Sequence, residues 1–199
     1  MDTQFQKKIL FINALVPLVL LSRDWYADSL GANPVEYFLR TTGVLTLIFL
    51  ILSLAVTPLR KIFGWNQLIK LRRMLGLFAF FYGCVHLITY SIFDKGLAIG
   101  AIVSDVWERP FIAFGMTAFA ILVPLGVTST NGMIKRLGGK NWQRLHRLVY
   151  AAGILGVVHF FLIQKSDFRY PIIFGSVLLI LLLYRLVARF RGPAILRAK

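Results

Sequence analysis

The sequence has few charged residues and a single cysteine. Only 16% of its 199 residues are Asp, Glu, Lys or Arg, whereas 58% are hydrophobic and the mean hydropathy is +0.73. A soluble domain of this length needs more polar surface. The composition therefore excludes a soluble domain and indicates a membrane protein. The lone thiol, Cys84, cannot form an intramolecular disulfide and is typical of a small buried hydrophobic residue.

Acidic residues are also scarce, with eight against 23 lysines and arginines, for a net charge of +15. On a soluble protein this excess would suggest a nucleic-acid partner. Here the basic residues flank apolar runs, which is where membrane topology places them. We therefore expect a lipid bilayer and no nucleic acid. The first apolar run, 9–21, lacks a small-x-small cleavage motif after it, so we predict a retained span.

Six apolar segments are long enough to cross a bilayer, which takes about 20 residues per helix. They cover residues 7–22, 38–57, 74–93, 110–128, 145–163 and 171–190. Short connections hold most of the charges, and prolines fall near segment edges, as at Pro34, Pro58, Pro110 and Pro171. The sequence predicts one domain over residues 1–199, an all-α polytopic membrane bundle of six transmembrane helices.

The basic residues predict the orientation of the bundle. With the N-terminus inside, all but six of the 23 lysines and arginines lie on the inner side; the six are Arg23, Arg40, Lys95, Arg109, Lys165 and Arg169. The acidic residues follow the opposite pattern, since Asp2 alone lies inside. Because short loops rich in Lys and Arg stay in the cytoplasm, we expect both termini to be cytoplasmic, in an inner membrane.

The three histidines all lie on two of these spans: His86 on the third, His146 and His159 on the fifth. Ionisable groups within a span are costly and are functional candidates by default, although an inter-helix hydrogen bond is the alternative. His86 lies 13 residues beyond Arg73, and His159 lies 15 beyond Arg144, so both reach roughly 20 Å into the membrane from the inner face. Two imidazoles at one depth can ligate a haem iron axially.

The neighbours of these histidines permit two interpretations. Small residues follow the same helix faces, namely Gly76, Ala79 and Gly83 before His86 and Ala152 and Gly156 before His159. They suit either a flat macrocycle or close helix packing. Candidates for further contacts are the tyrosines Tyr82, Tyr90 and Tyr150, and candidates for haem propionates are Arg72, Arg73, Arg144 and Arg147.

His146 is harder to place. It lies about 20 Å from His159 along the helix and about 140° around it, unless a kink near Gly153 reduces that angle. At its depth the third span offers Arg73, so a second haem with two histidine ligands is not available from this chain. His146 could bind a second haem whose other axial ligand is water or an unusual group. The alternative is that it contacts a propionate, a quinone or a flavin.

Several motifs, in their order and separation, resemble one family. They are VTPLR at 56–60, LRRMLGL at 71–77, HLITY at 86–90, RPFIAFG at 109–115, TST at 128–130 and WQRLHRLVY at 142–150, with His159 following. Together they resemble the MsrQ (YedZ) family, the haem-binding membrane subunits of bacterial periplasmic methionine sulfoxide reductase systems, in the ferric-reductase-like transmembrane group. The resemblance covers nearly the whole chain, and it implies that His86, His146 and His159 are haem ligands.

The resemblance also implies cofactors and partners. We expect haem b, one group with a second left open, and FMN only because it is associated with the family. The expected acceptor is an MsrP-like periplasmic molybdopterin enzyme, and the expected donor is a cytosolic flavin reductase or membrane quinol. The sequence has no GxGxxG nucleotide loop and, unlike full-length ferric reductases, no flavin or NADPH domain, so the donor is external.

The expected function is therefore that of an electron-transfer subunit without catalytic residues of its own. Two alternatives are a stand-alone ferric or quinone reductase of the b-cytochrome type, and a non-redox membrane anchor or transporter. Transporters usually carry charged residues in mid-span or broken helices at the midplane. No Asp, Glu or Lys is centred in a predicted span, which weakens the transporter alternative.

Overall fold

The computed structural model describes residues 2–190, and these form helices and no strand. In chain order the elements are α1 (Thr3–Tyr26), α2 (Pro34–Phe63), the 3-10 helix η1 (Asn66–Lys70), α3 (Arg72–Thr89), the π-helical turn η2 (Tyr90–Asp94), α4 (Ile99–Glu108), α5 (Pro110–Val127), α6 (Asn131–Leu137), α7 (Gly139–His146), α8 (Val149–Ile163) and α9 (Arg169–Phe190). Six candidate spans are found among the described residues: α1, α2, α3 with η2, α5, α7 with α8, and α9. The predicted all-α bundle of six spans is confirmed.

Helix α2 extends beyond the predicted segment 38–57 in both directions, and capping residues mark where it begins and ends. Asn33 caps α2 by accepting a hydrogen bond from the Glu36 N–H, and Pro34 occupies the first helical position. Gly64 ends α2 in the left-handed conformation, at φ +71°. The helix therefore runs five residues past Pro58, so the prediction that Pro58 lies at the segment edge is wrong.

Two further details differ from the sequence prediction. The connections expected at 94–109 and 129–144 contain the short helices α4 and α6, which apolar length alone does not detect. The fifth span begins earlier than expected, as α7, and it is interrupted at Arg147 and Leu148, directly after His146. The interruption is therefore not near Gly153, which lies inside α8.

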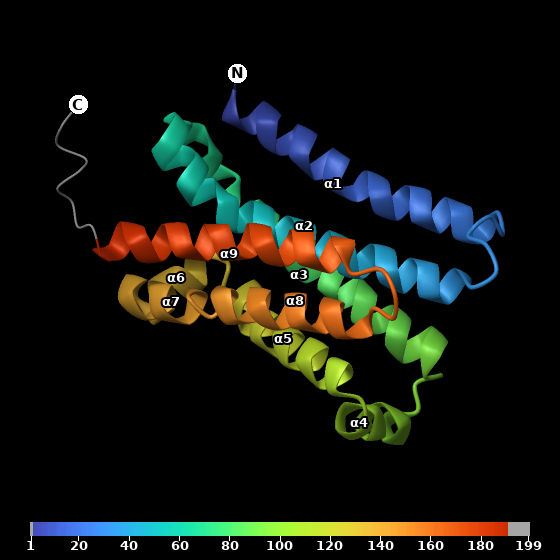
Figure 1. Cartoon of the computed structure of the whole chain (residues 1–199). Helices are drawn as coiled ribbons and strands as arrows, with labels where there is room; N and C mark the ends of the chain where they lie inside the picture. Colours follow the sequence, from blue (N-terminus) through green and yellow to red (C-terminus); the bar gives the residue numbers. More distant parts are fainter. Residues whose placement is uncertain (1, 191–199) are drawn as a thin grey trace.

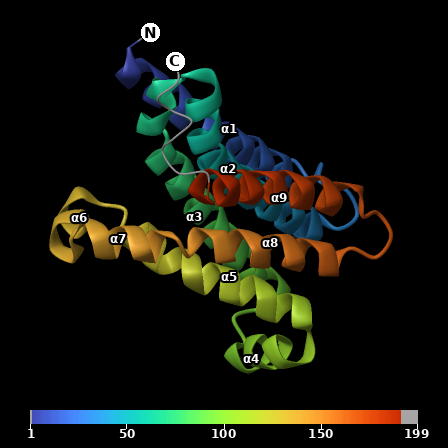
Figure 2. The same ribbon diagram turned by 60° about the vertical axis from the view of Figure 1, so that its left-hand side comes forward.

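The spanning helices pack as two close pairs. α2 packs along α3 and α5 packs along α8, while α9 covers α8 and α2 (Figure 1). α1 lies along the outside of α2 and α3 with fewer contacts. Figure 2 shows α6 and α7 reaching out at one end and α4 lying beside α5 at the other. The basic end, as we call it, holds η1, α6 and α7; the opposite end holds α4 and the α1–α2 and α8–α9 connections.

An aromatic stack forms the core between α2 and α3. The Phe49 ring lies 5.5 Å from the rings of both Phe78 and Tyr82. Tyr82 is fully buried, and its hydroxyl donates a 2.6 Å hydrogen bond to the Ala14 carbonyl of α1. The stack therefore fixes α3 against α2 and ties α1 to the pair.

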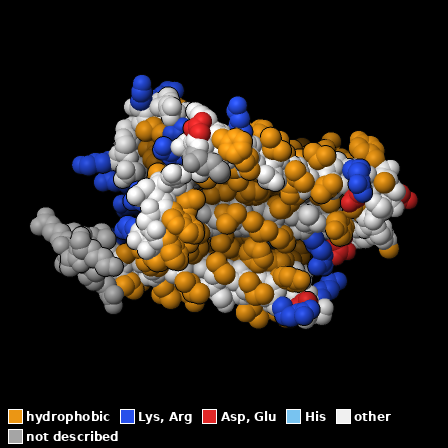
Figure 3. Space-filling view, turned by 90° about the horizontal axis from the view of Figure 1, so that it is seen from above, with side chains coloured by type: hydrophobic (Ala, Val, Ile, Leu, Met, Phe, Trp, Pro, Cys, Tyr) orange, Lys and Arg blue, Asp and Glu red, His pale blue; other side chains and the backbone are white. Residues whose placement is uncertain are grey.

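The outer surface is an apolar band between two charged ends. Large side chains such as Val19, Leu179 and Ile180 are exposed on α1 and α9. Figure 3 shows hydrophobic side chains covering the middle of the molecule, with mostly Lys and Arg at the basic end and both charge signs at the opposite end. Soluble monomers rarely expose apolar patches of this extent. The chain is therefore a multi-pass membrane protein.

Candidate functional site

His86 on α3 and His159 on α8 meet inside the bundle. Their ring centroids lie 6.2 Å apart and their planes are nearly perpendicular, at 86°. His86 lies in the last turn of α3, and the backbone partner of His159 lies in the first turn of α5. The pair is therefore nearer the opposite end than the basic end. The sequence prediction that these two residues share one depth agrees with this geometry.

Backbone carbonyls hold both imidazoles through Nδ1. His86 Nδ1 lies 3.0 Å from the Leu39 oxygen, and His159 Nδ1 lies 2.6 Å from the Phe111 oxygen. A carbonyl only accepts hydrogen bonds, so each Nδ1 must carry the proton. In a neutral ring Nε2 then keeps its lone pair, which is the arrangement that protein partners impose on metal-binding histidines.

Two glycines allow the neighbouring helices to approach the rings. A Cβ atom added at Gly115 of α5 would lie 2.8 Å from His159 Nδ1, and one at Gly43 of α2 would lie 3.2 Å from His86 Cε1. Thr42, next to Gly43, is fully buried with its hydroxyl 3.4 Å from His86 Nδ1. The backbones of α2 and α5 thus form the outer walls that support the two rings.

The donor set fits a haem better than a bare metal ion. No cluster of three or more His, Cys, Asp or Glu side chains exists within residues 2–190, and the usual protein metal sites need at least three. A porphyrin supplies four nitrogens itself and needs only two axial ligands. With metal–nitrogen bonds of about 2 Å, two axial imidazoles have ring centres roughly 6 Å apart. The separation of His86 and His159 matches this spacing.

His146 lies apart from this pair, at the end of α7. Its Nε2 is 3.1 Å from the Thr128 hydroxyl, and its ring stacks on Trp142 with centroids 3.9 Å apart. Thr128 gives its own proton to the Pro124 carbonyl at 2.6 Å, so its oxygen accepts from His146 Nε2. His146 therefore leaves Nδ1 free, the reverse of the other two histidines.

The structure gives the predicted neighbours other partners. The Tyr82 hydroxyl bonds to Ala14 and the Tyr90 hydroxyl to Asp105, while the Tyr150 ring lies beneath the Arg185 guanidinium. Arg73 donates to Asn131 at 2.7 Å and so joins α3 to α6. The tyrosines and Arg73 are thus used to hold helices together.

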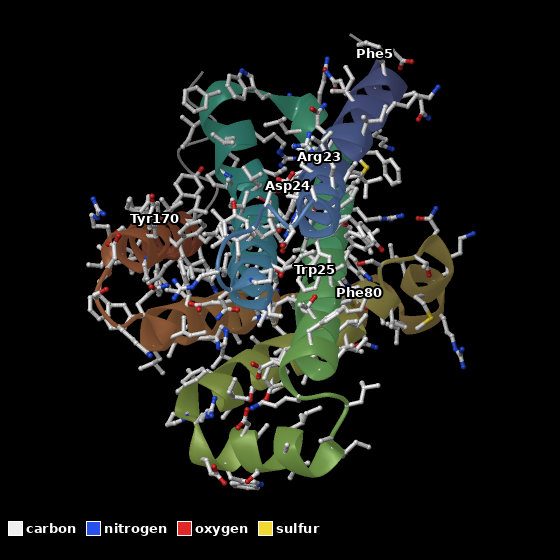
Figure 4. All side chains as sticks on the ribbon, turned by 90° about the vertical axis from the view of Figure 1, so that its right-hand side faces the viewer. Phe5, Arg23, Asp24, Trp25, Phe80 and Tyr170 are labelled. Carbon is white, nitrogen blue, oxygen red and sulfur yellow. The ribbon has the colours of Figure 1, made fainter. Side chains whose placement is uncertain are left out.

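The small residues on α3 and α8 lie mainly at helix contacts. A Cβ at Gly83 would meet the Phe119 ring, and one at Gly156 would meet Leu47 at 3.0 Å. Ala79 and Ala152 are buried in the core. Of the two interpretations of this pattern, the structure favours close helix packing. Figure 4 shows Phe80, whose ring stacks with that of Phe119, on α3.

Sequence reasoning missed the groups that orient the histidines. Leu39 and Phe111 act through backbone oxygens, which no side-chain pattern reveals. Gly115 and Thr128 fall in the RPFIAFG and TST motifs, but the motifs do not show what those residues contact. A glycine inside a predicted span, as at Gly43 and Gly115, was the available signal of a close approach.

Comparison with known proteins gives one consistent result. Residues 42–157 match the family model described as ferric reductase like transmembrane component, a stretch that includes His86 and His146. The chain is 53% identical to a protein of Herminiimonas arsenicoxydans over 90% of its own length and 83% of the relative's. It is 50% identical to a protein of Azospira oryzae, over 94% of this chain and 82% of that one.

A protein of Rhodospirillum rubrum is also 50% identical, over 91% of this chain and 87% of the relative. All three relatives carry the name protein-methionine-sulfoxide reductase heme-binding subunit MsrQ. Such identity over most of both chains agrees with the motifs and the histidine pair. The chain therefore belongs to the MsrQ family, within the ferric reductase-like transmembrane group.

Proposed function

We propose that the chain is a b-type haem protein that carries electrons across a bacterial inner membrane to a periplasmic MsrP-like methionine sulfoxide reductase. It serves the repair of oxidised periplasmic proteins as an electron-transfer subunit, and it does not reduce the sulfoxide itself. The observation that carries the proposal is the His86–His159 pair, with both Nδ1 atoms bonded to carbonyls and the rings 6.2 Å apart. The relatives' names as haem-binding subunits support it.

Within this proposal His86 and His159 are the residues that would hold the haem iron, through the Nε2 atoms that their Nδ1 hydrogen bonds leave unprotonated. The haem, when bound, supplies a one-electron redox centre. The Leu39 and Phe111 carbonyls fix the tautomer of each ring and make it a better donor to the metal. The spans that carry the two histidines are apolar, and a haem held between them would have an environment of low polarity.

His146 is the proposed ligand of a second haem nearer the basic end. It lies about 20 Å from His159 along the chain, so it would bring a redox group towards the other membrane face. Because Nε2 donates to Thr128, ligation requires either Nδ1 or release of that hydrogen bond. A propionate, a quinone or a flavin such as FMN is the alternative contact for this residue.

The proposed electron donor approaches from the cytoplasmic side or from the membrane. Both a cytosolic flavin reductase and a membrane quinol satisfy the need for an external donor. The basic end carries most of the lysines and arginines, which suits either anionic lipid head groups or an acidic protein partner.

A reoxidation experiment tests this function. The purified chain in lipid nanodiscs is reduced and excess reductant is removed. The haem absorbance is then followed after addition of the reductase, of methionine sulfoxide, or of both. Without oxygen and with a catalytic amount of an MsrP-like reductase, we expect full reoxidation only when methionine sulfoxide is also present. Reoxidation by a ferric chelate or quinone alone, with no effect of the reductase, would favour the stand-alone reductase. Absence of haem after expression with ample haem would leave the anchor or transporter hypothesis.

A further inference from the structure

Helix α4 (Ile99–Glu108) has three distinct faces. Ile99, Val103 and Trp107 lie within about 80° of one another and are 76%, 52% and 84% exposed. Ser104 and Glu108 lie roughly 120° further around and are also exposed. The remaining face carries Asp105, which is buried. A helix that packs on a protein and otherwise faces water needs only a packed face and a polar face. The separate exposed apolar face of α4 therefore requires a further partner.

The buried face ties α4 to the end of α3, which carries His86, and to the start of α5, which contacts His159. Asp105 accepts a 2.7 Å hydrogen bond from the Tyr90 hydroxyl and pairs with Lys95 at 2.6 Å. Its second oxygen lies 3.5 Å from Arg109 Nε. Tyr90 follows His86 by one turn, and Arg109 precedes Phe111, whose carbonyl bonds to His159. The orientation of α4 is thus fixed relative to α3 and α5.

The position of α4 matches the edge of the apolar band. Figure 1 shows α4 nearly end-on while the spanning helices run across the view, so α4 lies crosswise to them. Figures 2 and 4 place it at the side of the bundle, and it does not lie over the centre of the opposite end. Phe93 and Leu97, in the segment that joins α3 to α4, also have exposed side chains.

We propose that α4 is an interfacial helix that lies in the plane of the membrane, with Ile99, Val103 and Trp107 inserted among the lipids. Ser104 and Glu108 then face water, and Asp105 faces the bundle. Tryptophan is enriched at the membrane–water boundary, and an apolar face beside a polar one is the pattern of helices that lie in that boundary. The occupant of the apolar face is the bilayer, since α4 lies crosswise at the side of a bundle whose spanning helices are themselves apolar on their outer surface.

Site-directed spin labelling tests this placement. In a Cys84→Ala background, labels are introduced by Val103→Cys and, as the matched control one residue away, Ser104→Cys. The full chain is examined in lipid nanodiscs, and collision of each label with oxygen and with a water-soluble nickel chelate is measured. We expect the oxygen-to-chelate ratio to be several-fold higher at position 103 than at position 104.

Equal ratios at positions 103 and 104, with free access of the chelate to both, would overturn the proposal. Protection of position 103 only after addition of a soluble periplasmic reductase would also overturn it, because the face would then bind protein. Trp107→Cys provides a second label on the same face if the first variant folds poorly. Because the chain has four tryptophans, the part of the emission in nanodiscs that Trp107→Phe removes gives an independent readout. Lipids brominated near the head group should quench that part more than aqueous iodide does, and the reverse result contradicts lipid insertion.

Discussion

At His86 and His159, a single hydrogen bond to each ring decides which nitrogen is free. The Leu39 and Phe111 carbonyls can only accept, so they select the Nδ1-protonated tautomer and leave both Nε2 atoms available. At His146 the Thr128 hydroxyl makes the opposite selection. Histidine thus occurs as two different tautomers within one chain. The tautomer depends on whether the neighbour is a backbone carbonyl, which accepts from Nδ1, or a hydroxyl that already donates its proton elsewhere, which accepts from Nε2.

The glycines beside the rings give the first prediction. Gly115→Ala places a Cβ 2.8 Å from His159 Nδ1, closer than real contacts allow, so the ring must shift and its hydrogen bond to Phe111 must lengthen. We expect a marked loss of haem per protein, measured from the visible spectrum. Gly43→Ala, with its Cβ at 3.2 Å from His86, should have a smaller effect.

Gly76→Ala is the matched control, because nothing lies within 4 Å of its added Cβ. It should leave the haem content unchanged and alter stability by no more than about 1 kcal/mol. Equal haem loss in all three variants would show that the close approach at the histidines is not the cause.

At the scale of the elements, α4 depends on one buried carboxylate. The hydrogen bond from Lys95 and the Tyr90 hydroxyl keep the pKa of Asp105 below its ordinary value, and the bond to Asp105 raises the pKa of Lys95. Asp105 therefore stabilises the fold fully above its ordinary pKa, about 4, and this contribution is lost as the pH falls through the lower folded value. The contribution of Lys95 is present below about pH 10 and is lost as the pH rises through its raised value.

Asp105→Asn should accordingly remove the acid-side dependence that this pair contributes. We expect the contribution of Asp105 and Lys95 to the thermal stability of the wild type in detergent to be constant between about pH 5 and 9. It should decrease below about pH 4. The variant should lose about 1–3 kcal/mol near neutral pH, because Lys95 keeps its charge with only the longer ion pair to Asp94, at 3.4 Å. An unchanged melting temperature at pH 7 would show that the pair does not hold α4.

The attachment of α1 gives a third prediction. Tyr82→Phe keeps the aromatic ring stacked on Phe49 and removes only the hydroxyl that bonds to Ala14. We expect a loss of about 1 kcal/mol and faster amide hydrogen exchange in α1, with little change in α5 and α8. Tyr37→Phe, at an exposed position, is the control. If Tyr82→Phe increased amide hydrogen exchange equally in all helices, the result would contradict a local role for this bond.

At the scale of the whole molecule, the charge distribution predicts that the basic end faces the cytoplasm. Lys61 and Lys165 are exposed at the basic and opposite ends, and each can be replaced by cysteine in a Cys84→Ala background. In intact cells with a permeable outer membrane, a membrane-impermeant maleimide should label Lys165→Cys and should reach Lys61→Cys only after lysis. The reverse labelling would invert the proposed direction of electron flow.

Much of this molecule could be predicted from its sequence because the membrane reduces the choices. Apolar length sets the six spans, and the shared direction of the third and fifth spans brings His86 and His159 to one level. The helix α4 was not predictable in this way, because it is too short to be detected by apolar length. Which of its three faces is buried can be assigned only once the neighbouring helices are placed. The tautomers of the histidines likewise depend on backbone oxygens from α2 and α5, which sequence periodicity does not locate.

The measurement that tests the central claim most directly compares the wild type with His86→Ala and His159→Ala by visible and electron paramagnetic resonance spectroscopy. We expect a b-type haem spectrum and, because the two rings are nearly perpendicular, a low-spin iron signal of high anisotropy in the wild type. Each variant should lose that signal, and free imidazole should restore a low-spin signal. A wild-type signal that persists unchanged in both variants would show that His86 and His159 are not the axial ligands.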